Sequence, residues 1–102
     1  MSDSSTPSSA FHGPLSETEV LDVFGVHIRV LMPAGVTGGA LSMFEDHNDP
    51  GAGPPLHVHH DADEIFAVVT GSYRFMCNQN VMTASAGDVV LVPRGAPHTF
   101  LN

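Results

Sequence analysis

Residues 51–71 read GAGPPLHVHHDADEIFAVVTG, and residues 87–102 read GDVVLVPRGAPHTFLN. Both stretches contain short apolar runs that are rich in valine, leucine, isoleucine and phenylalanine. The runs are separated by glycine, proline and aspartate, which are typical of turns. Short runs bounded by turn residues favour β-strands over helices. Histidine and glutamate stand at the borders of these runs, where they can form a shared site.

Three histidines and one glutamate are the candidate site residues. His57 and His59 are two residues apart, so on a strand both imidazoles would point to the same face and could reach one metal ion. Glu64 opens an apolar run, an unfavourable place for a carboxylate unless it is paired or ligated. His98 follows the turn at residues 93–97, and a neighbouring strand could bring it to the same place. Taken singly, each histidine would be read as a surface or hydrogen-bonded residue.

The joint pattern resembles the cupin superfamily, which has two short motifs. The first motif is matched by Gly51, His57, His59, Glu64 and Gly71, and the second by Gly87, Pro93, Gly95, His98 and Asn102. The resemblance implies an all-β fold, a jelly-roll-like cupin β-barrel. It also implies one divalent transition metal ion held by His57, His59, Glu64 and His98. Imidazoles with one carboxylate suit Fe, Mn, Ni, Cu or Zn. Asn102 matches the motif, but asparagine in this setting more often ties a turn together.

Glu64 is the candidate catalytic residue. A carboxylate held weakly at a metal could shift away and take a proton from a substrate hydroxyl. Plain structural ligation is an equal alternative, and the sequence leaves both open.

Three functions fit such a site. Residues 53–60 and 63–66 resemble small quercetin-dioxygenase-like cupins, which implies a metal-dependent dioxygenase acting on a small aromatic or enolic molecule. A metal-dependent isomerase or lyase would use the ion only as a Lewis acid. A non-catalytic cupin would bind a small molecule without turnover.

Strand alternation also predicts which apolar side chains share the site's face. If Glu64 points inward, the alternate residues Phe66 and Val68 point inward as well. Counting two residues on from His98 in the same way gives Phe100. These three residues are candidate walls of a substrate pocket. Core packing alone would explain them equally.

The chain divides into two expected parts. Residues 1–14 are mostly small and polar, and we expect a flexible arm or a strand that docks on a neighbouring subunit. Residues 15–102 form the expected barrel domain, with strands at 20–32 (broken at Gly25), 40–45, 57–59, 64–70, 72–77, 81–84, 89–92 and 98–101. The evenly spaced turns suggest a meander.

The second motif ends at the last residue of the sequence, whereas the resemblance implies further strands after it. We therefore expect a barrel that lacks its last strands, either as a fragment or closed by a second copy, because open strand edges tend to pair. The resemblance also implies a homodimer.

Composition excludes several partners. Three arginines, no lysine and eleven acidic residues give a net charge of −8, which opposes binding to nucleic acid or anionic membranes. No apolar run approaches the ~20 residues that a membrane-spanning helix needs. The single Cys77 cannot form an intrachain disulfide, and the first residues lack a basic or apolar leader. We expect a cytoplasmic protein with a small-molecule substrate or ligand.

Overall fold

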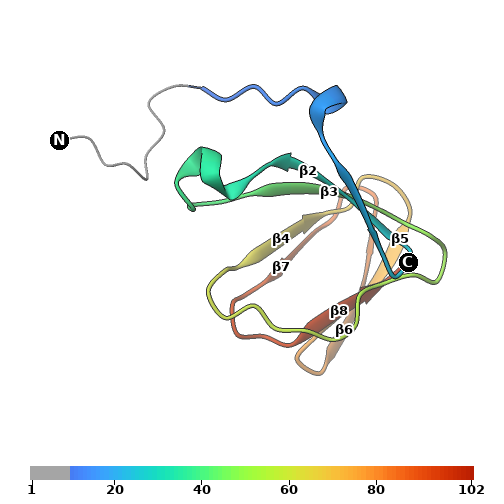
Figure 1. Cartoon of the computed structure of the whole chain (residues 1–102). Helices are drawn as coiled ribbons and strands as arrows, with labels where there is room; N and C mark the ends of the chain where they lie inside the picture. Colours follow the sequence, from blue (N-terminus) through green and yellow to red (C-terminus); the bar gives the residue numbers. More distant parts are fainter. Residues whose placement is uncertain (1–9) are drawn as a thin grey trace. The chain divides into compact units, whose positions relative to one another are not determined.

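The computed structural model describes residues 10–102, and strands dominate it (Figure 1). The elements, in chain order, are η1 (Leu15–Glu17), β1 (Val20–Val23), β2 (Val26–Met32), η2 (Ala34–Thr37), β3 (Met43–Asn48), β4 (Glu64–Ala67), β5 (Ser72–Cys77), β6 (Asn80–Ser85), β7 (Val89–Val92) and β8 (His98–Leu101). Only the two short 3₁₀ turns η1 and η2 are helical among these residues. The expected all-β class is confirmed.

Contacts group the chain into two compact units, one ending at His47 and the other beginning at Asn48. Residues 1–9 of the expected N-terminal arm lie outside the described residues, and residues 10–14 belong to no helix or strand. The arm at 1–14 and the domain at 15–102 therefore stay predictions. No helix within residues 10–102 is long and apolar enough to cross a membrane.

The first unit contains a three-stranded sheet in the order β1-β2-β3. β1 and β2 form a hairpin in which Val23 pairs with Val26, as the break at Gly25 predicts. Phe24 and Gly25 both have positive φ, at 56° and 74°, as a two-residue hairpin turn requires. The strand predicted at 40–45 begins and ends later, at Met43 and Asn48, because residues 38–40 still form the turn after η2.

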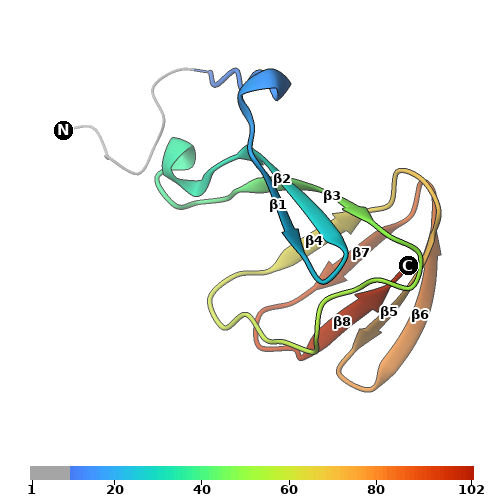
Figure 2. The same ribbon diagram turned by 45° about the vertical axis from the view of Figure 1, so that its right-hand side comes forward.

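The second unit contains two sheets, β4-β7 and β6-β5-β8 (Figure 2). The strands β5, β7 and β8 begin and end where the sequence predicts, whereas β4 ends earlier, at Ala67. The predicted meander is wrong, because β4 pairs with β7 and β5 pairs with β8. The connections at 68–71, 86–88 and 93–97 each lead from one sheet to the other, and each contains a glycine with positive φ: Gly71, Gly87 and Gly95. Apolar alternation reports which face of a strand is buried, but not which strand lies beside it.

The core of this unit lies on the inward faces of both sheets. Alternate residues of β7 and of β5 are buried, and the β4 register places Glu64 opposite Val92 and Phe66 opposite Val90. The buried cluster consists of Val68, Phe75, Cys77, Ala84, Val90, Val92, Ala96 and Phe100, with Phe66 and Tyr73 packed against it. Glu64 therefore stands at the border of an apolar core, as its sequence position suggests.

The segment before β4 runs alongside β8 without becoming a regular strand. Gly51 N–H donates to the Asn102 carbonyl (2.9 Å), and at the other end His57 and His98 exchange two backbone hydrogen bonds of 3.1 and 2.9 Å. The strand predicted at 57–59 is wrong, because only His57 makes a bridge. Pro54 and Pro55 have no N–H to donate, so a continuous ladder cannot form.

Candidate metal centre

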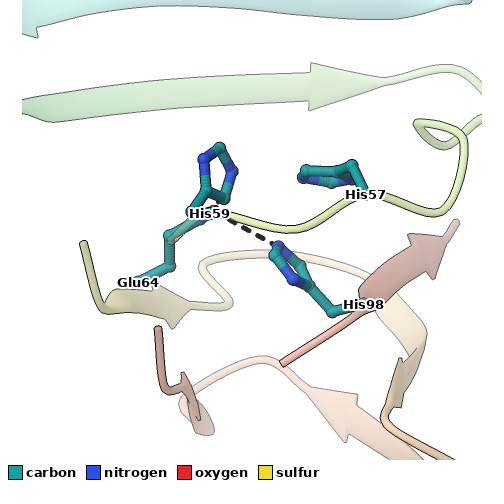
Figure 3. Close-up of side chains that lie close together, drawn as sticks. All are labelled: His57, His59, Glu64 and His98. Carbon is teal, nitrogen blue, oxygen red and sulfur yellow. Dashed lines mark hydrogen bonds and ion pairs between the residues drawn. The ribbon is translucent and has the colours of Figure 1, made fainter. Parts of the chain in front are cut away.

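Four side chains from three segments converge in the second unit (Figure 3). His57 comes from the bridge to β8, His59 from the irregular segment that follows it, Glu64 from the first residue of β4 and His98 from the first residue of β8. One nitrogen or carboxylate oxygen from each lies within 4.8 Å of those from the other three. The structure thus brings together all four residues that the sequence singled out.

Backbone carbonyls orient two of the imidazoles. His57 Nδ1 lies 2.8 Å from the Pro55 carbonyl oxygen, and His98 Nδ1 lies 2.9 Å from the Ala96 carbonyl oxygen. A carbonyl oxygen can only accept, so each Nδ1 carries the proton and donates. In the neutral ring, Nε2 then keeps its lone pair, which is the form that binds metals.

The Glu64 carboxylate lies between two of these rings. Its Oε1 is 2.6 Å from His59 Nε2 and 3.2 Å from His98 Nε2. Because His98 donates through Nδ1, its neutral Nε2 has only a lone pair to offer to a carboxylate that also only accepts. Two acceptors at this separation repel unless a cation lies with them, either a proton on the ring or a metal ion. This arrangement fits a bound cation.

Burial is uneven across the centre. The His98 side chain is 2% exposed, Glu64 is 30% exposed and His59 is 45% exposed. The imidazole rings stand close together, with centroids 4.2 Å apart for His57 and His98 and 5.0 Å apart for His57 and His59. The centre is therefore buried beside β8 and more exposed at His59.

The donor set fits the ion expected from the sequence. Three imidazole nitrogens and one carboxylate suit divalent Fe, Mn, Ni, Cu or Zn, whereas Mg²⁺ and Ca²⁺ prefer oxygen donors. Neutral imidazoles and one carboxylate also leave a divalent ion with net positive charge. The cluster could hold such an ion, and its donors suit all five of the expected metals.

One feature beside the centre was missed at the level of sequence. Asp63 accepts hydrogen bonds from the Arg94 backbone N–H (2.9 Å) and from its guanidinium Nε (3.2 Å) and Nη2 (3.4 Å). These bonds lower the pKa of the Asp63 carboxyl and raise the pKa of Arg94. Gly95 N–H donates to the His59 carbonyl at 2.7 Å. The sequence did not predict this ion pair, because charged residues in two separate loops follow no hydrophobic period. The only pointer was that Arg94 lies inside the second motif.

The candidate pocket residues lie in the core cluster. Val68 and Phe100 are buried, and the half-buried Phe66 ring lies 5.7 Å from that of Phe100 and 5.2 Å from that of Phe75. The inward orientation is as expected, and a role of these residues in substrate binding stays a prediction. Asn102 donates from its side chain to the Asn48 carbonyl, which ties two segments of the unit together.

Comparison with known proteins places this geometry in a family. The family model of the cupin domain matches residues 45–102, more than half of the chain. No curated protein matches the chain by sequence.

Solved structures similar to this chain include KdgF from Halomonas sp., with 21% identity, a TM-score of 0.77, and coverage of 91% of this chain and 82% of that one. A predicted oxalate decarboxylase from Thermotoga maritima has 22% identity and a TM-score of 0.77, covering 90% and 87%. A Streptomyces PAC13 variant with uridine has 18% identity and a TM-score of 0.73, covering 91% and 74%. PAC13 is described as a nucleoside dehydratase. At these identities the likeness shows the fold alone, which is the expected one. With the family model spanning both motifs, the chain belongs to the cupin domain family.

Proposed function

We propose that this protein is a metal-dependent enzyme that acts on a small organic molecule bearing an acidic hydroxyl or enol group. His57, His59, Glu64 and His98 would hold one divalent transition metal ion. The observation that carries the proposal is the convergence of one ligand atom from each of these four residues, all within 4.8 Å of one another.

The different burial of His98 and Glu64 suggests different roles for the two residues. His98 is buried and held through Nδ1, so its position would stay constant while a substrate binds. Glu64 is partly exposed, and its carboxylate could accept a proton from a substrate hydroxyl that enters beside His59. A divalent transition ion in this site would supply Lewis acidity or a change of redox state.

Two reaction classes remain in competition. The dioxygenase reaction is supported by the resemblance of residues 53–60 and 63–66 to small quercetin-dioxygenase-like cupins. A lyase or isomerase reaction is supported by the activities named for similar structures, a nucleoside dehydratase and a predicted decarboxylase. In either class, Glu64 would take a proton from the substrate in the first step.

Charge limits the choice of substrate. The chain has three arginines and no lysine, and two of the arginines are engaged: Arg94 with Asp63, and Arg29 with the Thr18 hydroxyl at 2.7 Å. A phosphorylated or multiply anionic substrate would find few cationic partners. A weakly charged aromatic or enolic molecule fits the metal and the apolar residues better.

Metal analysis and oxygen uptake test the proposal together. Mass spectrometry of the untagged protein should find close to one Fe, Mn, Ni, Cu or Zn per chain, and the His57→Ala, His59→Ala double variant should lose it. The metal-loaded protein is then supplied with enolic and aromatic hydroxyl compounds, with and without oxygen. Turnover that consumes oxygen identifies a dioxygenase, and turnover without oxygen identifies a lyase or isomerase.

Glu64→Gln separates the two roles of the carboxylate. If Glu64 is the base, this variant keeps much of its metal but loses turnover by about 10²-fold or more. Normal turnover in the variant would exclude the base role. Bound metal without turnover of any compound would favour the non-catalytic binding function. Absence of metal after reconstitution would refute the proposal.

The cytoplasmic location and the homodimer stay predictions. Sedimentation velocity of the full chain at several concentrations measures the second of these directly. A monomer at every concentration would contradict it.

A further inference from the structure

The Asp63–Arg94 ion pair joins two loops that the sheets leave unsupported. The two residues are 31 positions apart and are connected by three hydrogen bonds, one of them from the Arg94 backbone. The β4-β7 ladder ends at the pair Glu64 and Val92, so residues 58–63 and 93–97 lie beyond its last pair. Neither loop contains a strand or helix.

Both loops belong to the candidate centre. Asp63 directly precedes Glu64, and residues 59–63 connect His59 to Glu64. Arg94 lies in the turn that leads to His98, and the next residue, Gly95, donates its N–H to the His59 carbonyl at 2.7 Å. Within residues 10–102, every side-chain hydrogen bond made by Asp63 or Arg94 links the segment carrying His59 and Glu64 to the segment carrying His98.

We propose that the Asp63–Arg94 pair is a positioning clamp that holds His59 and Glu64 at the distance from His98 that metal binding needs. Neither residue is a ligand. The inference rests on the proposed metal site, and it adds two residues that act through the ligands. Because metal-site geometry must be held within fractions of an ångström, loosening a supporting loop lowers affinity without removing a donor atom.

Charge and geometry predict opposite effects for Arg94. A guanidinium near a cation site opposes metal binding, so if only its charge mattered, Arg94→Ala would tighten the binding. If Arg94 acts as a clamp, the same variant weakens it. Arg74→Ala is the matched control, because Arg74 is an exposed arginine on β5 whose side chain makes no hydrogen bond or ion pair within residues 10–102.

Cobalt binding to the full-length protein tests the clamp. Co²⁺ affinity is measured by chelator competition, and the visible spectrum of bound Co²⁺ reports the ligand geometry. We expect Arg94→Ala to bind Co²⁺ about tenfold or more weakly with an altered spectrum, by analogy with other residues that support ligands. Arg74→Ala should match the wild type, and Arg94→Lys should recover part of the affinity.

Amide hydrogen exchange gives a readout that needs no metal. In the metal-free protein, the Gly95 amide should exchange faster in Arg94→Ala than in the wild type, because the turn that holds it to the His59 carbonyl is released. Asp63→Asn, which keeps the side-chain shape, should speed this exchange as well. It provides a second variant if Arg94→Ala does not fold.

The outcomes separate the clamp from the proposed function. Wild-type Co²⁺ binding with unchanged or tighter binding in Arg94→Ala would overturn the clamp and leave the metal site standing. No Co²⁺ binding by the wild type would overturn the metal site, and the exchange of Gly95 would then decide whether the pair still holds the two loops. Unchanged Gly95 exchange in both variants would overturn the clamp.

Discussion

His98 and His59 represent the two extremes of burial among the four candidate ligands, and substitution should affect them differently. His98→Ala would remove a buried ring and leave the Ala96 carbonyl without its partner, so we expect the metal-free protein to lose about 2–4 kcal/mol of unfolding free energy. His59→Ala alters a half-exposed side chain and should change this free energy by about 0.5 kcal/mol at most. Urea denaturation with a chelator present measures both. Equal losses would contradict the difference in burial.

The identity of the site residues could be predicted from sequence, but their geometry could not. The spacing of His57 and His59 predicted that both could reach one ion, and the resemblance to the cupin motifs implied one cluster with Glu64 and His98. The structure brings all four together. The hydrogen bonds that orient the rings come from the carbonyls of Pro55 and Ala96, which carry no side-chain signal at all. Contacts made by backbone carbonyls are visible only once the chain is folded.

The bounds of a strand could be predicted where a run of alternating buried and exposed apolar residues sets its length. The strand β7 alternates exposed and buried valines and leucine, and its bounds follow directly from that run. The pairing of the strands could not be predicted from the sequence, because the turns that contain Gly71, Gly87 and Gly95 lead the chain to the other sheet. The segment before β4 failed as a predicted strand because two prolines interrupt its hydrogen bonding.

That segment depends on close backbone packing, which Gly53→Ala tests. A Cβ on Gly53 would stand 1.9 Å from the Phe100 carbonyl oxygen, so the segment would have to move away from β8. We expect a loss of about 2 kcal/mol or more in unfolding free energy and weaker metal binding, since His57 would shift from His98. Gly35→Ala is the matched control, because a Cβ there meets nothing within 4 Å. Its free energy should change by about 1 kcal/mol or less. Similar results for the two variants would refute the packing argument.

At the scale of the whole molecule, the candidate centre lies entirely in the second compact unit. All four candidate ligands follow Asn48, where that unit begins. Among residues 10–47 of the first unit, Val26 is the one buried hydrophobic residue, whereas the second unit has a cluster built from both sheets. Composition and strand pattern predicted the all-β class of the chain, but a grouping that depends on contacts between distant residues was not visible in the sequence.

Metal binding should therefore raise the stability of the protein in a concentration-dependent way. A ligand that binds only the folded state adds about 2.7 kcal/mol when its free concentration is a hundredfold above Kd. For a chain of this size that corresponds to a rise in Tm of roughly 10–20 °C. Differential scanning calorimetry with Zn²⁺ or Mn²⁺ should show the rise, and a chelator should abolish it.

The His57→Ala, His59→Ala variant should show none, because it keeps only two of the four donors. An equal rise in that variant would mean that the ion binds elsewhere, for example at exposed carboxylates, of which this acidic chain has many. Mg²⁺ is the discriminating control, because such carboxylates would bind it, whereas a centre of three imidazoles would not.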